Sequence, residues 1–167
     1  MALDFTRLKV LIIDDNDFMR RLLRELLWAL DCKPDNIRFA ANGRDGLDAL
    51  REYPTDLIIC DINMRPVNGK QFTLRVRTHP KSPDPYVPII ICTAHAEIEH
   101  ICGARDSGAN EILRKPVTAG SVYERIRAVV ERPRPFVHCD QYNGPDRRRQ
   151  DLPFNGPDRR NGSPVIV

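Results

Sequence analysis

The sequence predicts an α/β protein with a doubly wound, five-stranded parallel sheet, followed by a disordered C-terminal tail. Short apolar runs alternate with longer segments whose apolar residues recur at helical spacing, which is typical of a parallel sheet covered by helices on both faces. The run 57–60 is apolar throughout, as expected of a strand buried on both faces. From residue 132 onward proline and polar residues dominate, and such a segment buries too little apolar surface to offset its ordering entropy.

The first strand is predicted at residues 9–13 and the first helix at residues 18–30, with Asp17 as its N-cap. Leucines recur along one side of this helix and arginines along the other, so one face is predicted to pack on the sheet. Trp28 lies near the leucine stripe and is expected in the core. The other strands are predicted at residues 36–40, 56–61, 88–92 and 111–113, and the other helices at residues 44–53, 70–79, 94–107 and 119–131.

Length and composition indicate one domain, residues 1–131, with an appendage, residues 132–167. The five cysteines include no C-x-x-C pair and two lie in predicted buried strands, so we expect free thiols in a reducing cytoplasm. The N-terminus lacks a signal-peptide pattern and no long apolar span is present, so no membrane insertion is expected. The net charge of +3 does not by itself imply a polyanionic partner.

Polar side chains follow four of the predicted strands. Asp14 and Asp15 follow the first strand, Asp61 ends the third, Thr93 follows the fourth and Lys115 follows the fifth. Because loops at the carboxyl ends of parallel strands meet at one edge of a sheet, these side chains are expected to lie close together. Crowded carboxylates favour Mg²⁺, a carboxylate can attack a phosphoryl group, and a lysine can offset the transferred charge. The structural alternative is that the acidic pair caps a helix and Asp61 only ends a strand.

Residues 7–131 resemble the receiver domains of bacterial response regulators of the CheY type. The residues that carry the resemblance are Asp14-Asp15, Asp61, Met64, Gly69, Thr93-Ala94 and Lys115-Pro116. The resemblance implies a flavodoxin-like sheet of five strands flanked by five helices. It also implies a signalling protein without enzymatic output, in which a histidine kinase or phosphotransferase phosphorylates the acceptor.

The resemblance assigns a role to each matched residue. Asp61 is the expected phosphoacceptor, Thr93 the switch hydroxyl and Lys115 the salt-bridging lysine. The expected Mg²⁺ ligands are Asp14, Asp15, Asp61 and the backbone carbonyl of Asn63. Two departures are present: Met64-Arg65-Pro66 replaces the usual Met-Pro, and Ile112 stands where an aromatic residue often reports activation. No DNA-binding domain follows residue 131, so no DNA partner is expected.

The tail contains a repeat, because Tyr142–Arg148 recurs as Phe154–Arg160 with one change. Arginine can bind phosphates and the guanine edge, aspartate can accept from guanine N–H groups, and aromatic rings can stack on bases. Six arginines against four aspartates leave a net charge of +2 over residues 133–167, which favours specific recognition over a non-specific grip on phosphates. The candidate ligand-binding residues are Arg134, Tyr142, Asp146, Arg147, Arg148, Arg149, Phe154, Asp158, Arg159 and Arg160. The structural alternative is a solvated linker.

This tail is similar to the arginine-rich extension of the CheY-like cyclic di-GMP effectors called Cle proteins. The resemblance implies a cytoplasmic adaptor whose tail orders on cyclic di-GMP and whose receiver body docks on a target such as the flagellar motor switch, to control motility or surface attachment. Two alternatives stay open. One is a single-domain phosphorelay shuttle, phosphorylated at Asp61, with a passive tail. The other is an RNA-binding tail on a degenerate receiver.

Overall fold

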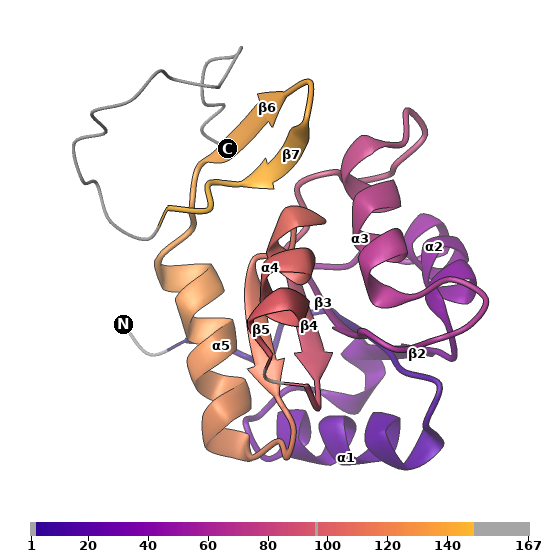
Figure 1. Cartoon of the computed structure of the whole chain (residues 1–167). Coiled ribbons are helices and arrows are strands. Elements are labelled where there is room, and N and C mark those ends of the chain that lie inside the picture. Colours follow the sequence, from indigo (N-terminus) through magenta and orange to yellow (C-terminus); the bar gives the residue numbers. More distant parts are fainter. Residues whose placement is uncertain (1–2, 96, 149–167) are drawn as a thin grey trace.

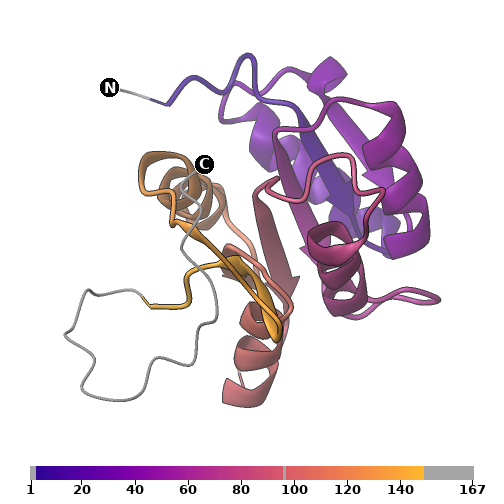
Figure 2. The same cartoon turned by 90° about the horizontal axis from the view of Figure 1, so that it is seen from above.

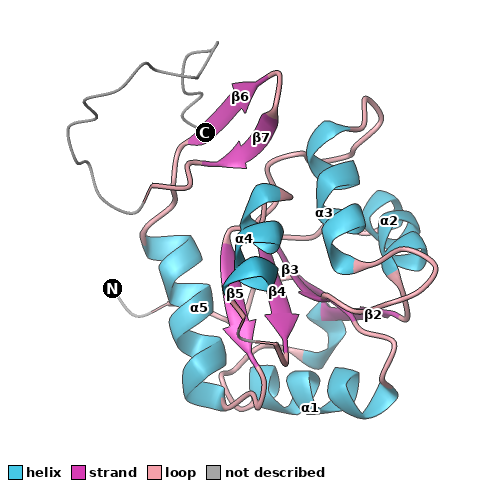
Figure 3. Cartoon of the chain, in the orientation of Figure 1, coloured by secondary structure: helices cyan, strands magenta, loops and turns pink. Residues whose placement is uncertain are grey.

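A five-stranded parallel sheet forms the centre of the computed structural model, which describes residues 3–95 and 97–148 (Figures 1 and 3). The strand order is β2-β1-β3-β4-β5. The strands are β1 (Val10–Ile13), β2 (Ile37–Ala40), β3 (Leu57–Asp61), β4 (Ile89–Thr93) and β5 (Glu111–Arg114). The order reverses between β1 and β3, so the predicted doubly wound sheet is confirmed, and the carboxyl ends of β1, β3 and β4 meet at one edge.

Helices cover both faces of the sheet (Figures 1 and 2). They are α1 (Asp17–Trp28), α2 (Gly43–Glu52), α3 (Gly69–Thr78), α4 (Ile98–Asp106), α5 (Ala119–Glu131) and a short 3-10 helix, η1 (Pro34–Asn36). Alternate residues of β1 enter different cores, because successive strand side chains point to opposite faces. Val10 and Ile12 pack with α1 and α5, whereas Leu11 and Ile13 pack with α2, α3 and α4.

Local details of two helices, α1 and α4, differ from the sequence prediction. Asn16 caps α1 by accepting a hydrogen bond from the Met19 N–H at 3.2 Å, and Asp17 is instead the first helical residue. Trp28 is 59% exposed, so the prediction of a core position is wrong. The buried face of α1 includes Leu27. Successive residues of an α-helix are rotated by about 100° around its axis, so Trp28 points away from that face. The helix predicted at 94–107 is shorter and spans Ile98–Asp106.

The prediction of disorder from residue 132 is wrong for the described part of the tail. Strands β6 (Phe136–Cys139) and β7 (Tyr142–Pro145) pair as an antiparallel hairpin beside α3 and α4 (Figure 1). Phe136, Val137 and Tyr142 are buried, and Phe136 packs edge-on against the Tyr86 ring at 5.1 Å. Three tail residues therefore extend the apolar core, and this burial offsets the entropy of ordering the hairpin. Residues 149–167, which include the second repeat, lie outside the described residues.

Arg77 joins the hairpin to the body. Its side chain is 2% exposed, and its guanidinium donates to the carbonyl oxygens of Gly108, Pro85 and Val87 and to Asn110 Oδ1, at 2.7 to 3.0 Å. Burial lowers the pKa of Arg77 to about 10, which still leaves the group protonated at neutral pH. The guanidinium lies 5.0 Å from the centre of the Phe136 ring, and the Arg77 carbonyl accepts from Asn143 Nδ2 at 2.6 Å. One buried cation thus ties the α3–β4 and α4–β5 loops to the tail.

Among the described residues, no helix has the length and apolar character needed to cross a membrane.

Candidate functional site

Three carboxylates gather at the carboxyl edge of the sheet, as the sequence predicts. Asp14 follows β1, Asp61 ends β3, and one oxygen from each of Asp14, Asp15 and Asp61 lies within 4.8 Å of the others. Asp14 and Asp61 are buried, whereas Asp15 is exposed to solvent. Two buried anions and one exposed anion in so small a space repel one another, and a cation offsets that repulsion.

Lys115 supplies one such cation from the end of β5. Its Nζ donates to Asp61 Oδ1 at 2.8 Å and lies 3.4 Å from Asp14 Oδ2. Burial alone would lower the pKa of Lys115, but the hydrogen bond and charge of Asp61 and the charge of Asp14 outweigh burial and raise it. Lys115 therefore stays charged and holds one oxygen of Asp61 in a fixed position.

The second oxygen of Asp61 is also held. Its Oδ2 accepts a hydrogen bond from the Asn63 backbone N–H at 2.9 Å. Thr93, which is buried at the end of β4, accepts at Oγ1 from the His95 N–H at 3.0 Å and contacts the His95 carbonyl at 3.3 Å. The Thr93 hydroxyl is thus held by its own loop in this conformation. The structure brings Asp61, Thr93 and Lys115 to one edge, and their chemical roles remain predictions.

Asp14 shows why this site suits a divalent cation. Burial raises the pKa of Asp14 and the Asp61 charge adds to that effect, against the hydrogen bond from the Asn16 N–H at 2.8 Å and the Lys115 charge. The donor set of Asp14, Asp15 and Asp61 consists entirely of carboxylate oxygens, the ligands that Mg²⁺ prefers. The residues present therefore fit Mg²⁺. Asn63 adjoins the cluster through its N–H, and its carbonyl as a ligand remains a prediction.

An open pocket of about 1030 Å³ lies beside the carboxylates. It is lined by Asp15, Asn63, Met64, Arg65, Pro66, Asn68 and Gln71. The inserted Arg65 is exposed and lines this pocket, so it places a positive charge beside the carboxylates. The sequence showed the departure from Met-Pro but not that the extra residue would face the pocket.

Gly69 lets the first turn of α3 approach the Asp61 backbone. A Cβ at this position would meet the Asp61 carbonyl oxygen at 2.3 Å, where only backbone could move to make room. We expect Gly69→Ala to destabilise the protein by about 1 to 3 kcal/mol and to shift the Asp61 loop. Gly120→Ala is the matched control, because its nearest neighbour is 3.9 Å away and the change should be neutral or stabilising by up to about 1 kcal/mol. Urea unfolding compares the two, and equal midpoints would contradict this account of Gly69.

The described tail residues form a second cluster, rich in arginine. Arg134 and Arg148 line a pocket of about 430 Å³. Arg148 also lines a neighbouring pocket of about 310 Å³ with Tyr142, Asp146 and Arg147. Half of the predicted ligand-binding residues are therefore brought together around Arg148. The other half lie outside the described residues: Arg149, Phe154, Asp158, Arg159 and Arg160.

Tyr142 does not present its ring as a stacking platform in this conformation, and its predicted role in stacking on a base stays a prediction. The ring is 8% exposed, its hydroxyl donates to the Pro145 carbonyl at 2.7 Å, and burial raises its pKa to about 12. The Arg147 guanidinium lies over the ring at 4.5 Å and pairs with Asp106 of α4 at 2.5 Å. The first repeat is thus bound to the body through Arg147, which pairs with Asp106, and Asn143, which bonds to the Arg77 carbonyl.

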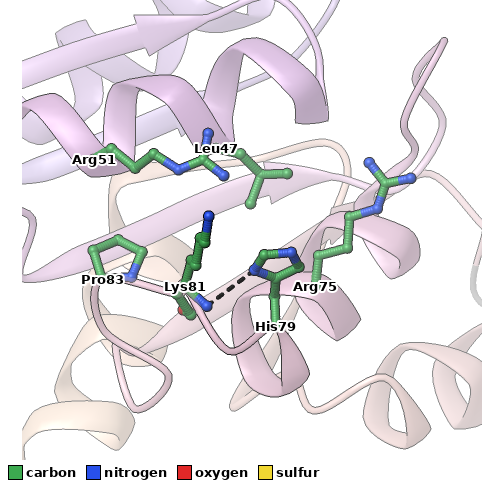
Figure 4. A pocket seen from close by; sticks show the side chains of 7 residues that line it. Leu47, Arg51, Arg75, His79, Lys81 and Pro83 are labelled. Atoms are coloured by element: carbon green, nitrogen blue, oxygen red, sulfur yellow. Dashed lines mark hydrogen bonds between the residues drawn. The ribbon is translucent and has the colours of Figure 1, made fainter.

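A further pocket of about 220 Å³ lies between the C-terminal ends of α2 and α3 (Figure 4). It is lined by Leu47, Arg51, Arg75, His79, Lys81, Ser82 and Pro83. Helices that connect parallel strands run opposite to them, so this pocket lies at the amino edge of the sheet, away from Asp61. Basic side chains commonly complement the C-terminal end of a helix, which accounts for Arg51 and Arg75.

Comparison with known proteins agrees with this geometry. Residues 10–127 match the family described as the response regulator receiver domain. A probable chemotaxis protein CheY of Rhizobium etli is 35% identical over 125 residues, which cover 75% of this chain and 91% of that protein. The chemotaxis protein CheY-3 of Vibrio cholerae is 30% identical over 75% of this chain and 93% of its own length.

Solved structures show the same likeness. The chemotaxis protein CheY4 of Vibrio cholerae superposes with a TM-score of 0.65 at 26% identity, over 73% of this chain and 98% of that one. A putative response regulator of Chloroflexus aurantiacus superposes with a TM-score of 0.67 at 28% identity, over 75% of this chain and 100% of that one. With its five-stranded sheet and acidic edge, the chain belongs to the response regulator receiver domain family, and its receiver is of the CheY type.

Proposed function

We propose that Asp61 accepts a phosphoryl group and that Asp14, Asp15 and Asp61 hold the Mg²⁺ that this transfer requires. The observation that supports this proposal most is the position of Lys115, whose Nζ lies 2.8 Å from Asp61 Oδ1 within a cluster of three carboxylates. If Asp61 only ended a strand and Asp14 and Asp15 only capped a helix, neither Lys115 nor the close packing of the three carboxylates would be required. This combination is what phosphoryl transfer to a carboxylate requires.

The transfer is a displacement at phosphorus. An Asp61 carboxylate oxygen bonds to phosphorus while the bond from phosphorus to the histidine nitrogen of the donor breaks, and the electron pair of that bond stays on nitrogen. Bound Mg²⁺ would offset negative charge on the transferred oxygens. Lys115 holds Asp61 in place before transfer and offers its charge to the new phosphoryl group afterwards. Thr93 can then turn its hydroxyl from His95 toward that group.

Removal of Mg²⁺ tests this proposal. We expect a small phosphodonor such as acetyl phosphate to label the protein with one phosphoryl group when Mg²⁺ is present. With a chelator in excess, the rate should fall by about a hundredfold or more, because three carboxylates then repel the anionic donor. Intact mass spectrometry over time measures both rates. Equal rates with and without Mg²⁺ would exclude the proposed role of the acidic cluster.

We further propose that the arginine-rich tail binds cyclic di-GMP, and that the chain is a cytoplasmic adaptor rather than an enzyme. The supporting observation is that Arg134, Asp146 and Arg148 of the first repeat region line two pockets that share Arg148. Arginine can bind phosphate through two N–H groups, and Asp146 can accept from guanine N–H groups. The second repeat carries the same residue types, and the ligand has two guanines and two phosphates.

A calorimetric titration with cyclic di-GMP tests the tail. We expect saturable binding that Arg148→Ala weakens at least tenfold, because one charge-assisted contact typically contributes about 1.5 to 3 kcal/mol. Arg21→Ala is the matched control, since Arg21 is an exposed arginine on α1 and should leave the affinity unchanged. Absence of heat at high ligand concentration would exclude this proposal. Tighter binding of single-stranded RNA, with a steep loss of affinity as salt rises, would instead support the RNA-binding alternative.

The target of the adaptor is proposed from the relatives. Two of them are named chemotaxis proteins, which supports a docking partner in the chemotaxis or flagellar motor apparatus, such as the motor switch, and a histidine kinase as phosphodonor. Cyclic di-GMP would act by changing how the tail lies on the body. A pull-down with purified motor switch protein, with and without cyclic di-GMP, checks this step, and equal capture in both conditions would exclude it.

A further inference from the structure

Two residues that both repeats contain, Asn143 and Arg147 in the first, bind the first repeat to the body. Asn143 donates from Nδ2 to the Arg77 carbonyl at 2.6 Å. Within the tail, the backbone N–H of Asp146 donates to the Pro135 carbonyl at 2.7 Å. Arg147 pairs with Asp106 at 2.5 Å. These three residue types recur at the matching positions of the second repeat, as Asn155, Asp158 and Arg159.

Among the residues that the two repeats share, Gly144 tolerates substitution least. A Cβ at this position would meet the Tyr142 hydroxyl at 2.7 Å and the Gly108 Cα at 2.8 Å, so no residue with a side chain fits without moving the backbone of the body. The second repeat keeps glycine here, at Gly156. A solvated linker would accept many residues at this position. Glycine at both positions is therefore what we expect if both repeats can occupy the same tightly packed site.

We propose that the surface formed by Arg77, Asp106 and Gly108 is a docking site for the sequence Asn-Gly-Pro-Asp-Arg, and that the second repeat of the same chain is its alternative occupant. In this exchange Phe154–Arg160 takes the place of Tyr142–Arg148 beside β6. The first repeat, which includes Asp146, Arg147 and Arg148, is then released from the body. This inference rests on the docking contacts and the repeat, and not on the proposed nucleotide binding.

The first repeat should be the preferred occupant, for two reasons. It reaches β6 through residues 140–141, whereas the second repeat must close a loop of residues 140–153, which costs about 20-fold in loop-closure probability. Phe154 also lacks the hydroxyl that Tyr142 donates to the Pro145 carbonyl, which costs about two- to tenfold more. The second repeat should therefore be docked in on the order of one molecule in a hundred.

A cycle of glycine variants tests the exchange, with amide hydrogen exchange of β6 (Phe136–Cys139) as the readout. Gly144→Ala should weaken docking of the first repeat and leave the second to cover β6. In the wild-type background, Gly156→Ala should leave the protection of the β6 amides against hydrogen exchange unchanged. In the Gly144→Ala background it should lower that protection by about tenfold, since it removes the remaining occupant. Amides of β3 serve as the control for global unfolding.

Phe154→Tyr gives an independent check. In the Gly144→Ala background it restores the missing hydroxyl, so β6 protection should rise by about two- to tenfold. If Gly156→Ala and Phe154→Tyr both leave β6 protection unchanged in that background, the second repeat does not dock on this surface and the proposal is overturned.

Discussion

Asp61→Asn is expected to abolish phosphoryl transfer while leaving the fold intact. The amide oxygen of asparagine can still accept from Lys115 Nζ, which contacts Asp61 Oδ1 at 2.8 Å in the native protein. The amide has no anionic oxygen to attack phosphorus, so labelling by a phosphodonor should fall by about a thousandfold or more. Loss of one of three crowded carboxylates also weakens Mg²⁺ binding, since fewer anionic oxygens remain.

Stability measurements separate this loss of chemistry from misfolding. Without Mg²⁺, Asp61→Asn removes repulsion from buried Asp14, so the unfolding midpoint in urea should stay equal or rise. The control variant is Asp48→Asn, an exposed aspartate on α2 that should keep native labelling. Retention of native labelling by Asp61→Asn would place the acceptor elsewhere.

Arg77→Met should have the largest effect on stability. Methionine keeps much of the side-chain volume but removes the guanidinium donor from the carbonyls of Gly108, Pro85 and Val87. The Asn110 side-chain oxygen also loses this donor but keeps the Ile89 N–H at 2.9 Å. An acceptor left unpaired in the interior costs about 1 to 3 kcal/mol, and partial relaxation should bring the total loss to about 3 to 5 kcal/mol. Urea unfolding measures this loss.

The neighbouring Arg75 supplies a control for Arg77. It lies on the exposed side of α3, so Arg75→Met should change stability by less than about 0.5 kcal/mol. Arg77→Met should also speed amide exchange in β6 and β7, because Phe136 packs on the guanidinium and Asn143 bonds to the Arg77 backbone. If Arg77→Met matched Arg75→Met in both measurements, the tail would not be tied to the body through Arg77.

The sheet and the acidic edge could be predicted because their signals are local. Each strand is a short apolar run, and the side chain that follows it lies at a known edge of a parallel sheet. That rule predicts that Asp14, Asp61, Thr93 and Lys115 lie close together. The strand pattern alone could not indicate the 2.8 Å contact between Lys115 and Asp61, since it depends on the end of β5 lying two strands away from β3. Only the resemblance to receiver domains assigned a salt bridge to Lys115.

The hairpin was missed because its partners are distant in the chain. The proline-rich composition correctly indicated that the tail has few apolar residues. Phe136 and Tyr142 are nevertheless buried, because a complementary surface of the receiver body is available for them to pack on. That surface depends on Arg77, which in sequence is one more arginine near the end of a helix. Arg77 is held by backbone carbonyls and not by an acidic side chain. The sequence therefore contains no acidic partner from which its burial could be predicted.

The central claim is that Asp61 receives the phosphoryl group, and borohydride reduction of the labelled protein tests it most directly. An acyl phosphate is reduced to an alcohol, so a phosphorylated aspartate becomes homoserine and can be located by peptide mass spectrometry. We predict homoserine at position 61 and unchanged aspartate at Asp14 and Asp15. Homoserine at either of the other two positions, or at none, would contradict the account.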